Sequence, residues 1–262
     1  MSSLAIEVRQ LVAHYGDRLI LDHVDLVVEP GEIMVIMGGS GSGKSTLLRQ
    51  LLGLHSPSSG SIKLLGQDIA TASAAQMQDL RRKMGVAFQG GALFGSLSVL
   101  ENVMLPLREH TRLDEQTMAI MARMKLEVVR LGELGELLPA QLSGGMVKRA
   151  ALARAIVMDP KLLFFDEPSA GLDPVVSAEL DELILTLRAS LPMSIVVVTH
   201  ELDSAFKIAD RITVLDRGKI LLTGSVPEVR NSSHERVQDL LNRRPRPEEI
   251  DADAYLRRLT GG

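Results

Sequence analysis

The sequence has 262 residues, 45% of them hydrophobic and 24% charged, which fits one α/β domain with a smaller appended subdomain. A formal net charge of −4 leaves no global positive field for a phosphate backbone, which argues against nucleic acid as a partner. The lack of cysteine excludes disulfides, thiolate metal sites and a cysteine nucleophile. With no secretory signal and no apolar run near the roughly 20 residues of a membrane span, we expect a cytosolic protein that needs a partner for any membrane work.

Short apolar and β-branched runs recur along the chain and predict strands. They cover residues 4–11, 24–28, 33–37, 61–65, 84–88, 162–166, 194–199 and 211–216. Helical patterns lie between or after them, at residues 44–52, 145–158, 174–188, 202–209, 226–231 and 235–241. This alternation predicts a layered α/β fold with a mixed sheet in which several core strands are parallel.

Residues 90–159 differ from the rest, because Met, Leu, Arg and Glu recur there at helical spacing without a convincing strand. We expect a helical subdomain inserted into an α/β domain of residues 1–242. Residues 243–262 follow as a loosely held tail with two prolines and mixed charges. The apolar residues that would let this tail dock are Ile250, Tyr255, Leu256 and Leu259.

A glycine-rich run, GGSGSGKST, follows the predicted strand 33–37 and opens the next predicted helix. It contains G-x-x-x-x-G-K-S in the context that this phosphate-binding motif requires. Its backbone N–H groups and the helix N-terminus can face phosphate oxygens, Lys44 can reach the β and γ phosphates, and the Ser45 hydroxyl can bind Mg²⁺. We therefore assign ATP binding to Gly38, Gly39, Ser40, Gly41, Ser42, Gly43, Lys44, Ser45 and Thr46.

The run LLFFDEP at residues 162–168 predicts a buried strand that ends in two carboxylates. Such a strand end faces the crevice where ligands bind in α/β folds. Asp166 is suited to hold Mg²⁺, and Glu167 to activate water for attack on the γ-phosphate. An acidic solvated turn would explain the dipeptide alone, but the phosphate loop beside it favours the catalytic interpretation.

With LSGGM at residues 142–146, the chain resembles the nucleotide-binding subunits of ABC transporters. In that family LSGGQ opens a helix whose N-terminus binds the γ-phosphate held by the opposite protomer, and N–H groups at a helix start do form anion sites. The resemblance assigns this contact to Ser143, Gly144 and Gly145. It extends from residue 1 to about 225 and implies a P-loop NTPase of ABC-ATPase type that binds ATP and Mg²⁺, works as a homodimer and drives an integral-membrane permease.

The same resemblance assigns four further residues. Tyr15 matches the aromatic residue that stacks on adenine, and Gln89 matches the glutamine that touches Mg²⁺ and water. Asp173, in SAGLD, matches the loop that crosses the dimer interface, and His200 matches the histidine that contacts the γ-phosphate. Taken alone, each residue also fits ordinary packing or a polar strand end.

Within this family, three phrases resemble the members that power Mla-type phospholipid trafficking in Gram-negative envelopes, which maintains outer-membrane lipid asymmetry. They are AFQGGALFGSLSVLENV, LSGGMVKRAALARAI and FFDEPSAGLDPVVSAELDELI, which carry the variant residues Met146 and Gly171. This resemblance implies an MlaE-like permease, an MlaB-like STAS-domain protein and an MlaD-like MCE lipid-binding protein as partners. It also implies a location on the cytoplasmic face of the inner membrane and a tail that reaches the neighbouring protomer.

Several alternatives stay open at this point. An ABC importer ATPase for a small solute would have the same site chemistry. A soluble ABC ATPase is disfavoured by the single cassette and the short chain, and a module without turnover is disfavoured by Glu167. Residues 89–107 are either a permease dock or internal packing. The basic clusters 81–83 and 243–246 are either solvated faces or contacts with lipid headgroups or nucleic acid.

Overall fold

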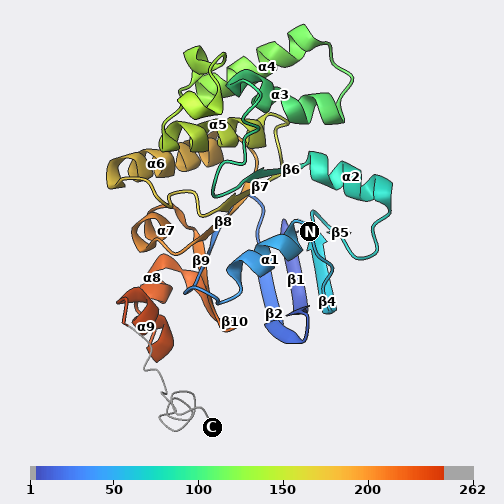
Figure 1. Cartoon of the computed structure of the whole chain (residues 1–262). Helices are drawn as coiled ribbons and strands as arrows, with labels where there is room; N and C mark the ends of the chain where they lie inside the picture. The colour runs from blue at the N-terminus through green and yellow to red at the C-terminus, as the bar shows by residue number, and fades with distance from the viewer. Residues whose placement is uncertain (1–3, 245–262) are drawn as a thin grey trace, which may run out of the picture.

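The computed structural model describes residues 4–244 and folds them into two β-sheets with helices packed around them (Figure 1). The larger sheet has six strands in the order β10-β9-β3-β8-β7-β6. Five of them run parallel and β10 is antiparallel to β9, so the predicted mixed sheet is confirmed. The strands are β3 (Ile33–Met37), β6 (Met84–Ala87), β7 (Leu162–Asp166), β8 (Ser194–Thr199), β9 (Arg211–Asp216) and β10 (Lys219–Ser225).

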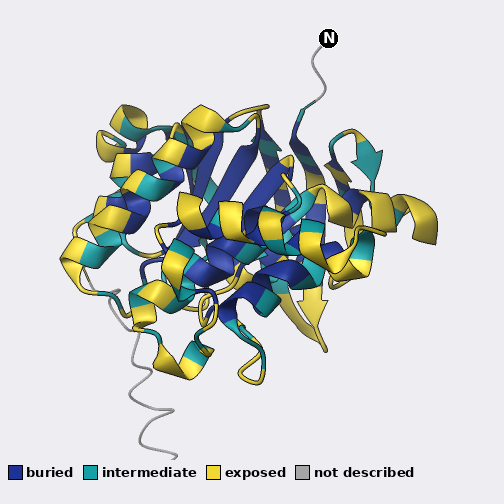
Figure 2. Cartoon of the chain, turned by 90° about the horizontal axis from the view of Figure 1, so that it is seen from above, coloured by how far each residue is buried: buried dark blue, intermediate teal, exposed yellow. Residues whose placement is uncertain are grey.

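Every residue of β3 and β8 is buried, as expected of parallel strands covered on both faces. Figure 2 shows these strands in dark blue between helices whose outer sides are exposed. Met34 and Ile36 join the core on one face of the sheet, whereas Val35 joins the core on the other. Because the sheet separates two apolar cores, residues at its strand ends lie at the rim, where polar side chains can reach a ligand.

The smaller sheet is antiparallel, with the order β2-β1-β4-β5. Helix α1 (Lys44–Leu51) shares a core with it through Leu47, Leu48 and Leu51. The strands are β1 (Ile6–Tyr15), β2 (Arg18–Val28), β4 (Ser59–Leu64) and β5 (Gln67–Asp68). Both β1 and β2 are longer than predicted, because register shifts after Val8 break the period-2 alternation that marks a strand.

Helices α3 (Val99–His110), α4 (Glu115–Val128) and α5 (Gly144–Ile156) form the upper part of Figure 1, and residues 4–244 contain no strand between β6 and β7. They share the core on the second face of the large sheet, and α5 also packs closely on β6. A Cβ at Gly85 would lie 2.1 Å from the carbonyl oxygen of Ala155, so the backbones of β6 and α5 nearly touch. This contact ties the helical region to the strand that ends just before Gln89.

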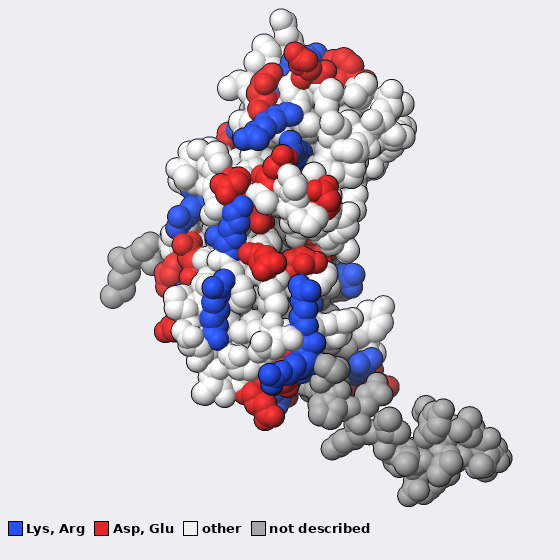
Figure 3. All heavy atoms as spheres, turned by 90° about the vertical axis from the view of Figure 1, so that its left-hand side faces the viewer, with Lys and Arg blue, Asp and Glu red and all other residues white. Residues whose placement is uncertain are grey.

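The remaining helices are α2 (Ala74–Arg82), α6 (Pro174–Ser190), α7 (Leu202–Ile208), α8 (Val226–Arg230) and α9 (Glu235–Leu241). Helix α2 is polar and buries only Leu80, so the hydrophobic pattern of the sequence does not predict it. None of the helices within residues 4–244 is long and apolar enough to cross a bilayer. In Figure 3, acidic and basic side chains are interspersed over the face on the left of Figure 1, with no broad basic patch.

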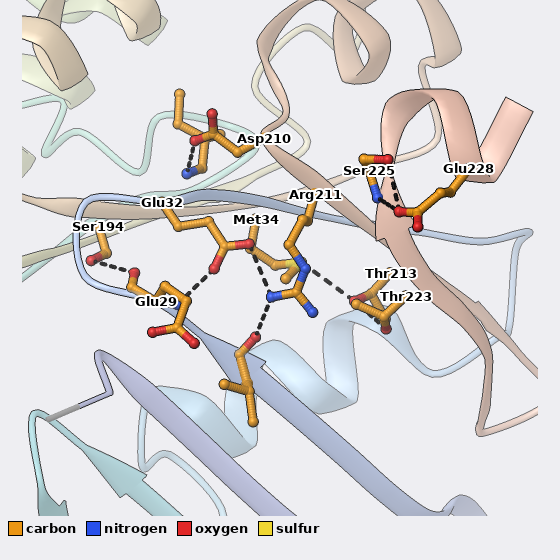
Figure 4. Close-up of polar contacts among 12 residues, drawn as sticks. Glu29, Glu32, Met34, Ser194, Asp210, Arg211, Thr213, Thr223, Ser225 and Glu228 are labelled. Atoms are coloured by element: carbon orange, nitrogen blue, oxygen red, sulfur yellow. Dashed lines mark hydrogen bonds and ion pairs between the residues drawn. The ribbon is translucent and has the colours of Figure 1, made fainter. Parts of the chain in front are cut away.

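A polar network joins the amino ends of β3 and β9 (Figure 4). Glu32, only 6% exposed, accepts a hydrogen bond from the Glu29 N–H at 2.6 Å and pairs with Arg211 at 3.3 Å. Arg211 also donates to the carbonyl of Val27 in β2, so the network links the two sheets. Burial raises the pKa of the Glu32 carboxyl, although the Glu29 N–H and Arg211 act in the opposite direction.

Candidate functional site

Residues 38–43 leave the carboxyl end of β3 and enter α1 in a loop that requires glycine. A Cβ at Gly38 would lie 2.1 Å from the backbone oxygen of Leu215, so no side chain fits there. Gly43, which precedes α1, has φ 108°, a left-handed conformation that other residues rarely adopt. The loop therefore leaves its backbone N–H groups accessible to a ligand, as a phosphate-binding loop does.

The ammonium group of Lys44 is held at this loop. It donates hydrogen bonds to the carbonyl oxygens of Gly38 at 2.8 Å and Gly39 at 3.1 Å. Burial lowers the pKa of the lysine, and the negative charges of Glu167 and Asp166 oppose that effect. An ammonium group has three N–H donors, so one is left for a phosphate oxygen.

The buried hydroxyl of Ser42 gives a second indication that the loop fits a ligand. Ser42 is 3% exposed, and its Oγ atom has no hydrogen-bond partner among residues 4–244. Buried polar groups are normally hydrogen-bonded, so this hydroxyl is available to bond to a ligand that occupies the loop. Ser45, at the start of α1, is exposed and presents its hydroxyl at the same end of the helix.

Two carboxylates lie at the end of β7, which pairs with β8 in the middle of the large sheet. Asp166 is the last residue of β7, and burial, followed by the charge of Glu167, raises the pKa of its carboxyl. The positive charges of Arg49 and Lys44 act in the opposite direction. Asp166 therefore faces two cations from the phosphate-loop helix, which places it near the expected phosphate site.

Glu167 is held in place by β8. Its N–H donates to the carbonyl of Val198 at 2.8 Å, and its backbone adopts a left-handed conformation with φ 50°. Its Oε2 atom lies 2.9 Å from Nδ1 of His200 and also accepts the His200 backbone N–H at 3.3 Å. Because Oε2 is engaged, Oε1 is left to accept a proton from a bound water.

The chain thus brings together Lys44, Asp166, Glu167 and His200, which come from segments up to 156 residues apart in sequence. The physical reason is that β3, β7 and β8 are parallel neighbours, so the residues after them meet at one edge of the sheet. Tyr15, at the end of β1, and Gln89, in the turn after β6, are both exposed, and Tyr15 is 79% exposed.

The start of α5 packs against the beginning of α6. Ser143 caps the helix by accepting a hydrogen bond from the Met146 N–H at 3.3 Å, and Ser143 and Gly144 are exposed. A Cβ at Gly145 would lie 2.6 Å from the Val176 side chain, so this helix start packs on the beginning of α6. Asp173 caps α6 by accepting N–H bonds at 3.0 and 3.1 Å from the two residues after Pro174.

The structure adds one residue that the sequence analysis did not single out. Lys148, on α5, donates hydrogen bonds to carbonyl oxygens of the segment that follows Glu167. Its only sequence signal is its place two residues after LSGGM, where a lysine ordinarily indicates a solvated helix face. Its role emerges from the tertiary contact.

No group of three or more His, Cys, Asp or Glu side chains within residues 4–244 could hold a metal ion unaided. A divalent ion at this site would therefore need phosphate oxygens in addition to the Ser45 hydroxyl and the Asp166 carboxylate. Hydroxyl, carboxylate and phosphate oxygens are the ligands that Mg²⁺ prefers in nucleotide sites. These donors fit Mg²⁺. Because phosphate oxygens complete the set, we expect the metal and the nucleotide to bind together.

Comparisons with known proteins agree with this geometry. The family model for ABC transporters matches residues 21–170. The chain is 41% identical, over 92% of its length and 91% of the relative, to the intermembrane phospholipid transport system ATP-binding protein MlaF of Haemophilus influenzae. It is 40% identical, over 92% of its length and 70% of the relative, to the "Probable ribonucleotide transport ATP-binding protein mkl" of Mycobacterium leprae.

Among solved structures, the chain is similar to the ATP-binding cassette MJ0796 in a dimeric post-hydrolysis state bound to ADP and Pi. The TM-score is 0.77 with 30% sequence identity, and the match covers 84% of this chain and 98% of that one. The expected P-loop fold is thereby confirmed, and the family match spans the phosphate loop, the start of α5 and the two carboxylates. The chain belongs to the ABC transporter family and carries its ATP-hydrolysing cassette.

Proposed function

We propose that this ATPase powers phospholipid transport between the inner and outer membranes and so maintains outer-membrane lipid asymmetry. The observation that carries the proposal is the identity of 41% with a phospholipid-transport ATPase along nearly the full length of both chains. The mkl relative, at 40% identity, carries the name of a ribonucleotide transporter, so a small polar solute is the alternative cargo. The ATP site is common to both, and the cargo must be tested directly.

In the proposed catalytic cycle, the glycine-rich loop of residues 38–43 and Lys44 bind the phosphates of ATP, and the Tyr15 ring stacks on adenine. Ser45, Asp166 and Gln89 would hold Mg²⁺, which would neutralise charge on the phosphate oxygens.

Hydrolysis then depends on Glu167. Its Oε1 accepts the proton of the attacking water, while His200 fixes Oε2 and lies where it can contact the γ-phosphate. A carboxylate that is immobilised before the reaction loses little orientational freedom in the transition state.

We further propose that two copies complete each other's sites. The N–H groups at Ser143, Gly144 and Gly145 form an anion site at the start of α5, where Ser143 and Gly144 are exposed and Gly145 is half-buried. A second copy facing it head to tail would place this helix start on the γ-phosphate, and Asp173 would lie at the interface. The solved relative MJ0796 is a dimer, which supports this arrangement.

The proposed permease dock keeps only part of residues 89–107 and adds Phe88, just before them. The inner side of α3, including Val99, Val103 and Leu107, is fully buried and belongs to the core. Phe88 and Phe94, in contrast, are 40% and 59% exposed and line a groove of about 340 Å³ beside Arg154. Exposed aromatic side chains in a groove commonly mark a protein interface.

We place the chain on the cytoplasmic face of the inner membrane, where an MlaE-like permease, an MlaB-like STAS-domain protein and an MlaD-like MCE protein would assemble with it. The proposed domain of residues 1–242 contains the cassette with its helical region at about 90–159.

The proposed contact of residues 243–262 with the neighbouring protomer falls largely outside the described residues. The basic cluster 81–83 includes Lys83, whose ammonium group pairs with Asp79 at 2.6 Å on the surface, as a solvated face does.

The experiment is to purify the chain with its native membrane partners and to identify co-purifying subunits and bound lipids by mass spectrometry. We expect a permease, an MCE protein, a STAS-domain protein and phospholipid. A solute-binding protein with an importer permease would refute phospholipid transport and leave the ATPase intact. Recovery of the chain with no membrane protein would favour a soluble ABC ATPase.

A further inference from the structure

Lys148 makes a contact that ordinary helix-surface lysines do not make. Its Nζ atom lies 2.6 Å from the carbonyl oxygen of Pro168, 2.5 Å from that of Ala170 and 3.4 Å from that of Glu167. These are three backbone acceptors for the three N–H donors of an ammonium group. A lysine is thereby fully engaged by one short segment of backbone.

The contact is partly shielded from water. Lys148 is half-buried, and burial lowers the pKa of its ammonium group while the charge of Glu167 opposes that change. Hydrogen bonds from a charged donor are stronger than those between neutral groups, and stronger still away from solvent. The segment of residues 167–170 is therefore held on α5 by a charged group and not by apolar packing alone.

The held segment begins at the carboxylate expected to activate water. On its amino side, Glu167 is fixed to β8 through Val198 and His200. On its carboxyl side, Lys148 fixes the following carbonyls, and the segment continues to Asp173 at the start of α6. With φ 50°, Glu167 has a backbone conformation that neighbouring contacts must maintain.

Lys148 also lies one turn after the start of α5, the helix whose first N–H groups form the proposed anion site. In the proposed dimer, this helix start serves the nucleotide of the partner, whereas Glu167 serves the nucleotide of its own chain. A stiff contact between the two would therefore join the two ATP sites.

We propose that Lys148 is a positioning residue for hydrolysis, which holds the Glu167 segment in register with the Ser143–Gly145 helix start and so couples the two ATP sites of the dimer. The coupling part of this inference rests on the dimer proposed above. The Lys148 side chain does not need to touch nucleotide, because it acts through the backbone of residues 167–170.

The test compares Lys148→Met and Lys148→Arg with the wild type in the full-length chain. The methionine variant keeps an unbranched side chain of similar length but removes all three donors. The arginine variant keeps the charge but presents its donors in a planar fork that cannot converge on three carbonyls in the same way. Lys125→Gln is the matched control, since Lys125 is also half-buried but pairs with Asp159 at 2.6 Å on the helical region.

For each protein, the rate of phosphate release is measured against ATP concentration, together with binding of a fluorescent ATP analogue and the melting temperature. We expect Lys148→Met to lower kcat at least tenfold and to bring a Hill coefficient above 1 in the wild type down to 1. Analogue affinity should change less than twofold, Lys148→Arg should be intermediate, and Lys125→Gln should match the wild type.

Wild-type kcat and Hill coefficient in Lys148→Met would overturn the proposal, as would a loss of kcat that Lys125→Gln reproduces. If Lys148→Met does not fold, Lys148→Arg decides: unchanged kcat there overturns the positioning role. A wild-type Hill coefficient of 1 would overturn the coupling. Absence of turnover in the wild type would instead count against the catalytic scheme proposed for the site.

Discussion

Asn102 offers a sharp test of how the loop before α3 is organised. The side chain is fully buried, and its amide group forms hydrogen bonds with the backbone of the preceding loop. Its Oδ1 atom accepts the Phe94 N–H at 2.8 Å, and its Nδ2 group donates to the carbonyls of Phe94 at 3.0 Å, Ser98 at 2.9 Å and Leu97 at 3.2 Å. Nδ2 has two hydrogens, so the side chain contributes three hydrogen bonds at any time.

Replacing Asn102 with alanine removes all three. At a net 0.5 to 1.5 kcal/mol for each bond, we expect the free energy of unfolding to fall by about 2–4 kcal/mol. Asn102→Asp, which keeps the acceptor but loses both donors and buries a charge facing carbonyl oxygens, should be at least as destabilising. Asn231→Ala, at an exposed position, is the control and should change stability by less than about 0.5 kcal/mol.

The assay is urea denaturation of the full chain, with stability taken from the midpoint and the slope. A loss below about 1 kcal/mol for Asn102→Ala, at unchanged slope, would refute the hydrogen-bond reasoning because it would fall short of three bonds. Phe94, which lies on this loop, is exposed at the proposed permease groove. Asn102→Ala should therefore also reduce the amount of permease that co-purifies with the chain, and normal recovery would separate the loop from docking.

Glu167→Gln should lower phosphate release at least about 100-fold while ATP still binds, because an amide cannot accept the proton from water; turnover near wild type would contradict the assigned base. Gly85→Ala should lower the free energy of unfolding by roughly 1–3 kcal/mol through overpacking against the Ala155 carbonyl, and an unchanged melting temperature would contradict the close approach of β6 and α5. Burial raises the pKa of Glu32, so the folded state binds this proton more tightly than the unfolded state. The stability of wild type relative to Glu32→Gln should thus be highest below the ordinary pKa of 4.5 and fall as pH rises through the raised value; urea midpoints at several pH values would show it, and a constant difference would count against it.

The sequence by itself determined the elements and motifs whose evidence is contiguous. The phosphate loop around Lys44 is predicted by an apolar strand, six loop residues and a lysine at the start of a helix. These features are adjacent in the chain, so no tertiary contact is needed to place the loop at the end of the strand. The same holds for β7 and its two carboxylates. The strands β5 and β10 and helix α2 escaped prediction, since short or partly exposed elements lack a periodic apolar pattern.

Only the tertiary structure decided which distant groups meet. Glu167 and His200 are 33 residues apart, and Glu32 and Arg211 are 179 apart; their contacts depend on the register of parallel strands. Lys148 and Asn102 look in sequence like ordinary helix residues, and their importance comes from backbone carbonyls that turn toward them. Local propensity acts over a few residues, whereas hydrogen bonds to a folded loop exist only after the core has placed that loop.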